Sequence, residues 1–294
     1  FLRDFSSVSL FAGLEMSSVF SLSGLLAGSS ILTSFLASQA DATTGLPLSA
    51  LLSGLAESDA LVLLPSHAAF SGYQYAFNQR TQLTPQVRIL CKTKTGVERA
   101  LSWLKENKIE FAIRAGGHSY EGFSQSRIVV LDLRLMNQVS FDVASQVVTA
   151  QAGALLGQVY QAVGAEGFAI AAGSCPTVGL AGHLQGGGVG LLARPLGLAC
   201  DALIEAEVLC ADGQWRIASE TENADLFWAI RGGGGGTFGL VTQFKLKATE
   251  LKKVTTFAST WLLPPRKALA VFQDWKKLID KNRENEEKIA ELRD

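Results

Sequence analysis

Two side chains that can bond to another molecule sit in glycine-rich turns of this sequence. His118 lies in IRAGGHSYEGFSQ and Cys175 in AAGSCPTVGLAGH. An imidazole at such a turn is a hydrogen-bonded turn residue, an acid or base, or a nucleophile bonded to a cofactor. The thiol is either a small buried apolar group or one presented to a ligand, because Gly173, Pro176 and Gly179 build a rigid turn around it.

The glycines themselves indicate the kind of ligand. Two glycine-rich loops that end strands suit a flat aromatic cofactor with a diphosphate tail, because backbone N–H groups can approach phosphate oxygens where side chains are absent. A dinucleotide-binding Rossmann fold is the alternative, and it fits less well. No GxGxxG joins a first strand to a helix, and Pro195, soon after GGGVG, would interrupt a helix there.

The composition is that of a globular protein and argues against several classes. The chain has 294 residues, 48% of them hydrophobic, and a net charge of -1. It can bury one large core or two modest ones, and it has no basic surplus for nucleic acid or an anionic membrane. The four cysteines and three histidines show no zinc-site spacing, so we expect no metal. We expect a monomer with neither nucleic acid nor a stable membrane partner.

Residues 1–40 differ from the rest of the chain. Serine, leucine, alanine and glycine dominate, and no charge appears between Glu15 and Asp41. The apolar run over 19–36 and the small residues at 38–40 resemble a signal peptide with its cleavage site, although Arg3 is the only basic residue before the run. We therefore expect a leader over 1–40 and a secreted or periplasmic protein. A membrane anchor or an unstructured leader is the alternative.

From Pro85 onward, short β-rich runs alternate with helical periodicity. Apolar residues at i, i+3, i+4 and i+7 predict helices over 97–104 and 156–163, and a short helix is expected over 224–230. Asp212 and Gly213 predict a hairpin turn. After the breaker Pro264-Pro265, a charged amphipathic helix is expected over 267–293. The predicted strands are 86–92, 110–117, 127–133, 146–153, 202–210, 214–219, a run after the five glycines of 232–236, and 254–263.

Three segments, taken together, resemble a known family. RAGGHSYEG, GSCPTVGLAGHLQGGGVGLLARPLGLACD and DLFWAIRGGGGGTFGLVTQF are similar, in this order, to the signatures of berberine-bridge-enzyme-like oxidases, in the vanillyl-alcohol-oxidase flavoprotein superfamily. The resemblance runs from about Pro65 to Leu262. It implies an α+β fold: a PCMH-type FAD-binding domain of two α+β subdomains over 41–252, then only the start of a substrate-binding α+β domain over 253–294.

The resemblance implies a bicovalently attached flavin. In that family the histidine of the RxGGH turn is bonded to the 8α-methyl group of FAD and the cysteine of the GxCxTVG turn to C6 of the same ring. His118 and Cys175 occupy these positions. Two tethers would hold the ring in place and draw electrons from it, which makes it a stronger hydride acceptor and permits an open cleft.

Further cofactor-binding residues follow from the same resemblance. At Val178 the family uses a small aliphatic side chain to let dioxygen reach the flavin, so valine favours an oxidase over a dehydrogenase. The expected pyrophosphate residues are Arg114, Ala115, Gly116, Gly117, His118, Ser119 and Ser124; those along the ring and ribityl chain are Thr177, Val178, Gly179, Gly182, His183, Gly187 and Gly190; and those at the adenine half are Gly239 and Val241.

The resemblance implies an FAD-dependent oxidase that moves a hydride from a carbohydrate, alcohol or amine substrate to the flavin and forms hydrogen peroxide with dioxygen. The family's catalytic tyrosine belongs to a later segment, so no catalytic residue is assigned. The alternative is a truncated flavin-binding module without activity of its own. Val189, Pro195 and Ala202 depart from the family pattern and put the substrate side in doubt.

Overall fold

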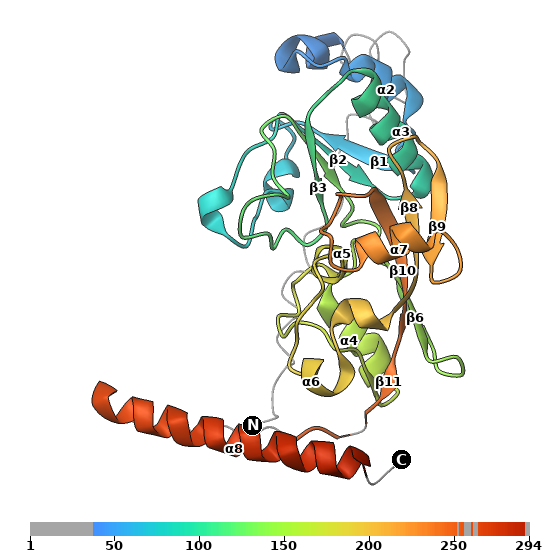
Figure 1. Cartoon of the computed structure of the whole chain (residues 1–294). Helices are drawn as coiled ribbons and strands as arrows, with labels where there is room; N and C mark the ends of the chain where they lie inside the picture. The colour runs from blue at the N-terminus through green and yellow to red at the C-terminus, as the bar shows by residue number, and fades with distance from the viewer. Residues whose placement is uncertain (1–37, 252, 256–259, 261–263, 292–294) are drawn as a thin grey trace. The chain divides into compact units, whose positions relative to one another are not determined.

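The computed structural model describes residues 38–251, 253–255, 260 and 264–291. The chain divides into two compact units between residues 252 and 253. The first unit is a mixed α and β structure with two main sheets, whose strands appear in Figure 1. This agrees with the α+β fold and the two subdomains that the sequence predicts.

The first sheet has the strand order β1-β2-β4-β3. Its strands are β1 (Ala60–Leu63), β2 (Val87–Cys91), β3 (Phe111–Arg114) and β4 (Val129–Asp132). β2, β4 and β3 are parallel, and β1 pairs antiparallel with β2. All five residues of β2 and all four of β4 are buried, as expected of parallel strands covered on both faces. The helices α2 (Leu48–Gly54) and α3 (Lys94–Glu106) contact each other, and α3 contacts β2.

The second sheet has the order β5-β6-β10-β8-β9 and is antiparallel throughout. The hairpin between its last two strands turns at Asp212 and Gly213, as predicted, and Gly213 has a φ of 83°. α4 packs on β5 and β6, and α7 on β9. The bounds are β5 (Val139–Asp142), β6 (Val147–Gln151), α4 (Leu156–Gly164), β8 (Leu203–Leu209), β9 (Trp215–Ser219), α7 (Ala224–Ile230) and β10 (Leu240–Lys247).

Shorter elements complete the first unit. β7 (Phe168–Ala169) pairs with β11 (Thr249–Glu250). The remaining pieces are η2 (Phe70–Tyr73), η3 (Gln79–Thr81), α5 (Leu180–Gln185), α6 (Ala193–Leu196) and η4 (Ala199–Ala202). Pro195 lies within α6, which has four residues and ends at Leu196, so no long helix follows GGGVG, in agreement with the expectation from this proline. In a helix of four residues its missing N–H falls in the first turn, where no intrahelical bond is lost.

A buried charge cluster links the three parallel strands of the first sheet. Asp132 on β4 lies 2.7 Å from Arg88 on β2, and both side chains are fully buried. The same carboxylate lies 2.9 Å from Arg134 and 3.8 Å from Arg114 on β3. Burial, reinforced by Arg134, lowers the pKa of Arg114 to about 10. One carboxylate thus faces three guanidinium groups, which leaves excess positive charge beneath the turn that follows β3.

The leader expected over 1–40 lies outside the described residues apart from its last three. Residues 38–44 are helical, and Ala40 packs into the core. Within the part of the chain that the structure describes, no helix combines the length and the apolar character needed to cross a bilayer.

The second unit contains α8 (Pro265–Glu291), which agrees with the helix expected over 267–293. Pro265 begins it, a position that tolerates proline. The strand expected over 254–263 is not seen at residues 254, 255 and 260, and its other positions lie outside the described residues.

Candidate cofactor site

The two glycine turns singled out from the sequence meet in space. One follows β3 and carries His118; the other precedes α5 and carries Cys175. At their crossing, a Cβ built on Gly116 would lie 2.2 Å from the backbone nitrogen of Gly179, and a Cβ on Gly179 would lie 2.4 Å from that of Gly116. Contacts this short are not tolerated, so only glycine allows the two backbones to touch here.

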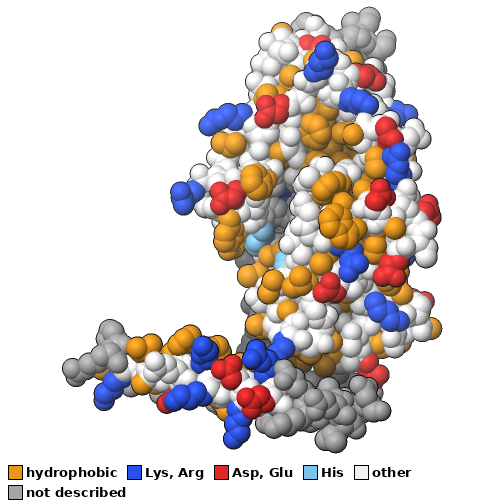
Figure 2. Space-filling view, viewed as in Figure 1, with side chains coloured by type: hydrophobic (Ala, Val, Ile, Leu, Met, Phe, Trp, Pro, Cys, Tyr) orange, Lys and Arg blue, Asp and Glu red, His pale blue; other side chains and the backbone are white. Residues whose placement is uncertain are grey.

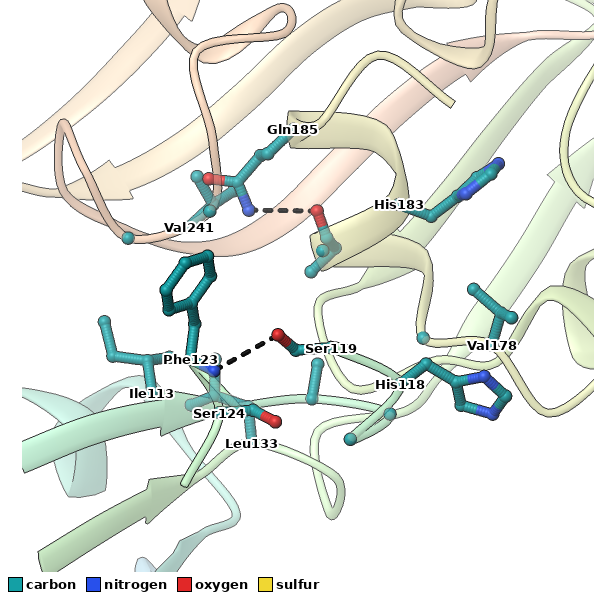
Figure 3. Close-up of a pocket in the computed structure, with 18 of the residues that line it drawn as sticks. Ile113, His118, Ser119, Phe123, Ser124, Leu133, Val178, His183, Gln185 and Val241 are labelled. Carbon is teal, nitrogen blue, oxygen red and sulfur yellow. Dashed lines mark hydrogen bonds between the residues drawn. The ribbon is translucent and has the colours of Figure 1, made fainter. Parts of the chain in front are cut away.

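A pocket of about 460 Å³ opens beside this crossing, a volume in the range of small-molecule sites. Figure 2 shows a hollow in which histidine side chains are visible, with hydrophobic side chains around it. In Figure 3, His118 and Val178 lie on one side, Gln185 and Val241 on another, and the ring of Phe123 reaches toward Val241. Among the described residues that line the pocket, none is Asp, Glu, Lys or Arg.

Most of the residues expected from the sequence line this one pocket, although they come from three separate segments of the chain. Those that do are Ala115, Gly116, Gly117, His118, Ser119, Ser124, Cys175, Val178, Gly179, Gly182, His183, Gly239 and Val241.

Four expected residues lie outside the lining. The Arg114 side chain is 3% exposed and donates to the Tyr75 carbonyl, with its guanidinium packed under Gly117. Thr177 bonds to His118 instead of facing the cavity. A Cβ on Gly190 would lie 1.8 Å from the carbonyl oxygen of Ala172, so this glycine allows a close backbone contact. Gly187 has a φ of 100°, which favours glycine for its conformation.

His118 is partly exposed and has contacts on two sides. Its Nε2 lies 3.1 Å from the Thr177 hydroxyl. The ring of Phe77 stacks on the imidazole, with centroids 4.4 Å apart and planes inclined by 17°. Burial, together with the positive charge of Arg114, lowers the pKa of His118 below its ordinary value of 6.5. The imidazole is therefore neutral at pH 7, the state in which a ring nitrogen can act as a nucleophile.

Side chains of two helices form hydrogen bonds with the turn that carries Cys175. The N–H of Gly173 donates to Nε2 of His183 on α5 at 2.9 Å, and the Tyr160 hydroxyl on α4 donates to the carbonyl of Gly173. Burial lowers the pKa of His183 and raises that of Tyr160 to about 12, so both groups are neutral. Cys175 itself is exposed, whereas Cys91 and Cys200 are buried and Cys210 is half-buried.

Several lining residues were not anticipated. Gly235 and Gly236 belong to the five-glycine run, whose length was a signal in the sequence, and Gln185 lies two residues after His183. Phe77 and Tyr120 reach the pocket from its rim. The others, which mostly supply apolar walls, are Ile113, Phe123, Leu133, Ala181 and Leu240.

The lining fits FAD in two respects. The Oγ of Ser124 is buried and has no hydrogen-bond partner among the described residues, so it can bond to a ligand. The N–H groups of residues 116–119 donate to no backbone carbonyl of the described turns and loops. Free N–H groups at a glycine turn bind phosphate oxygens well, and the excess positive charge near Asp132 supports an anion there. The apolar walls suit a flat ring.

Among the described residues, no group of three or more His, Cys, Asp or Glu side chains could hold a metal ion.

Comparison with known proteins supports an FAD site. Residues 85–219 match a family model described as an FAD binding domain. An FAD-linked oxidoreductase of Bacillus subtilis, itself uncharacterized, is 40% identical over 182 residues, which are 60% of this chain and 40% of the relative. Berberine bridge enzyme-like C-1 of Nicotiana tabacum is 38% identical over 194 residues, 64% of this chain and 34% of the relative.

Solved structures show the same relationship. BBE-like 1 of Physcomitrella patens has a TM-score of 0.64 and 34% identity, covering 68% of this chain and 44% of that one. The xylooligosaccharide oxidase of Myceliophthora thermophila, solved with xylobiose, has a TM-score of 0.63 and 33% identity, covering 68% of this chain and 43% of that one.

Fold, pocket and comparisons together define an FAD-binding domain of an oxidoreductase. More particularly, the curated relatives and solved structures that the chain resembles include berberine-bridge-enzyme-like proteins and FAD-linked oxidoreductases. The chain spans 34% to 40% of the length of the two curated relatives described above.

Proposed function

We propose that the chain binds FAD through two covalent bonds, from His118 and from Cys175, and that the protein to which it belongs is an oxidase. The observation that carries the proposal is that two side chains 57 positions apart line one pocket with apolar walls and free N–H groups. In each attachment, a hydrogen on a flavin carbon and a hydrogen on the side chain are replaced by one covalent bond. The two electrons and two protons released reduce one dioxygen to hydrogen peroxide.

In this proposal, different residues of the chain bind different parts of FAD. Free N–H groups of residues 116–119 and the Ser124 hydroxyl hold the diphosphate, and the apolar walls exclude water from the ring. Bound FAD supplies an acceptor for a hydride from a substrate C–H bond and passes the electrons on to dioxygen. Val178 lines the pocket as a small aliphatic side chain, which supports dioxygen as the acceptor.

We propose a carbohydrate or another alcohol as the substrate. Support comes from the xylooligosaccharide oxidase among the similar structures, which was solved in complex with xylobiose. A second candidate is a flavin-binding module without independent activity. It is supported by the family match, because residues 85–219 match a model described as an FAD binding domain, which accounts for flavin binding without implying turnover.

The test is to express the full chain, denature it in acid, and follow the flavin absorbance of the polypeptide, then to assay peroxide with a panel of oligosaccharides and alcohols. Flavin that stays with the polypeptide, together with peroxide formation, supports the oxidase. Retained flavin without turnover supports the module. Loss of all colour on denaturation overturns covalent attachment.

The lowered pKa of His118 predicts a measurable pH dependence. In flavin-free protein, the imidazole should titrate below pH 6.5, because burial and Arg114 both disfavour the imidazolium. The unfolded chain then binds more protons than the folded one around its own pKa, so the free energy of unfolding falls as the pH decreases through 6.5 and below. Histidine NMR spectra recorded against pH measure the midpoint directly.

A synthetic peptide of residues 115–127 is the matched control for this titration. It carries the same local sequence, AGGHSYEGFSQSR, without the burial and without Arg114. Equal midpoints for His118 in the peptide and in the protein would show that the fold does not favour the neutral imidazole.

A further inference from the structure

The imidazole of His118 is contacted on two sides by residues from outside its own turn. Phe77 comes from the segment before β2, 41 positions earlier, and its ring stacks at 4.4 Å. Thr177 comes from the turn of Cys175, 59 positions later, and its hydroxyl lies 3.1 Å from Nε2. We propose that Phe77 and Thr177 are positioning residues for His118, which set the plane and the tautomer of the imidazole before it bonds to the flavin. This inference rests on the proposed covalent attachment.

The backbone holds Phe77 in place. Its N–H donates to the carbonyl of Gly117 at 3.1 Å, directly before His118. The next residue, Asn78, donates from its side chain to the carbonyl of Tyr120 at 2.7 Å, directly after the turn. The two bonds join one short segment to both sides of the histidine. The ring of Phe77 also lies nearly parallel to that of Tyr120, with centroids 6.0 Å apart. The Phe77 ring therefore supports His118 from a fixed position.

Thr177 belongs to an equally well-held turn. The carbonyl of Pro176 accepts from Gly157 at 2.9 Å, and the carbonyl of Val178 accepts from Leu156 at 2.9 Å, both at the start of α4. The hydrogen bond between Thr177 and His118 therefore links the two turns that carry the proposed attachment residues. It places the imidazole relative to Cys175, and not only relative to its own loop.

The proposed role implies one tautomer. Among the described residues, Nε2 of His118 has the Thr177 hydroxyl as its hydrogen-bond partner and Nδ1 has none. If Nε2 carries the proton and donates to Thr177, Nδ1 keeps its lone pair and is free to form the bond. Stacking on Phe77 restricts rotation of the ring, so the lone pair is held in one direction. In the attachment reaction, the positive charge that develops on the imidazole is stabilised by the same hydrogen bond, and the departing proton leaves from Nε2.

The first experiment follows bond formation at each residue separately. Full-length flavin-free protein is mixed with FAD in air, quenched in acid at intervals, and digested. Trypsin releases His118 in the peptide 115–127, and cleavage after glutamate releases Cys175 in the peptide 167–205. Mass spectrometry then measures the flavin carried by each. Thr177→Val and Phe77→Ala should each slow attachment at His118 by about tenfold or more while leaving attachment at Cys175 closer to the wild-type rate.

Conservative variants separate positioning from general destabilisation. Thr177→Ser keeps the hydroxyl and Phe77→Tyr keeps the stacking face, so both should attach flavin to His118 at nearly the wild-type rate. Equal rates at His118 in wild type, Thr177→Val and Phe77→Ala would overturn the proposal. So would an equal slowing at His118 and Cys175, because that indicates loss of the whole pocket.

The second experiment needs no flavin. Nitrogen NMR of the flavin-free full chain, labelled at its three histidines, reports the tautomer of each ring. His118 should show protonated Nε2 in wild type and in Thr177→Ser, and a shift toward the tautomer mixture of free imidazole in Thr177→Val. A free-imidazole mixture in the wild type overturns the positioning role. If instead the wild type shows the expected tautomer but never carries flavin at His118, the proposed attachment fails and the tautomer assignment stands.

Discussion

Replacing both His118 and Cys175 with alanine should release all of the flavin when the protein is denatured, whereas either single replacement should leave it attached. Each side chain lines the same pocket from a different turn, so each forms its bond without requiring the other. A covalent bond survives acid denaturation, and a set of hydrogen bonds does not, so the difference between the single and double variants is all or none. Flavin absorbance of the acid-precipitated polypeptide measures it.

Controls for this prediction come from the same residue types elsewhere. His67→Ala and Cys210→Ala remove an imidazole and a thiol that are absent from the pocket lining, and both variants should keep the flavin in acid. The peptides 115–127 and 167–205 provide a second reading, because each single variant should carry the flavin mass on the remaining peptide only. Release of flavin from either single variant, with the native fold retained, would mean that only one of the two residues is bonded.

Both turns can be predicted from the sequence because their conformation depends on residues that are adjacent in the chain. A strand that ends in consecutive glycines exposes its backbone, and a residue such as His118 that follows directly is presented with little around it. The period-2 and period-3.6 patterns likewise predict β2, β3, β4 and α3, since burial on one face or both is visible in a short window. The two-subdomain fold followed from the resemblance and agrees with the two sheets.

Contacts between segments far apart in the chain, in contrast, produce no pattern in the nearby sequence from which they could be predicted. Phe77 stacks on His118 across 41 positions, and nothing in the residues around Phe77 indicates that partner. Arg114 illustrates a related case: the resemblance implied a pyrophosphate contact for this residue, and the structure shows its side chain buried near Asp132. A signal for this did exist, because Asp132 interrupts an apolar run and a buried carboxylate needs a cationic partner.

A replacement at the point where the two turns cross should also have a large effect. Gly116→Ala should lower the free energy of unfolding by about 3 kcal/mol, the upper part of the range for overpacking, because the new methyl group meets backbone atoms that cannot rotate away. For a unit of this size the melting temperature should fall by roughly 6 to 12 °C. If the turns separate to relieve the contact, the pocket beside their crossing no longer binds FAD next to either side chain, so covalent flavin should be lost as well.

Two other glycines make this prediction specific, because a Cβ on Gly182 or Gly164 would meet nothing within 4 Å and neither has a positive φ. Both lie in helices, where alanine is favoured over glycine by about 1 kcal/mol, so neither replacement should lower the melting temperature. Gly182 lines the pocket, and its alanine variant should incorporate less flavin because the methyl group enters the space of the ring. Gly164 ends α4 outside the lining, and its variant should keep normal flavin content. A Gly116→Ala protein as stable as wild type would contradict the backbone contact, and a Gly182→Ala protein with full flavin would place the ring elsewhere.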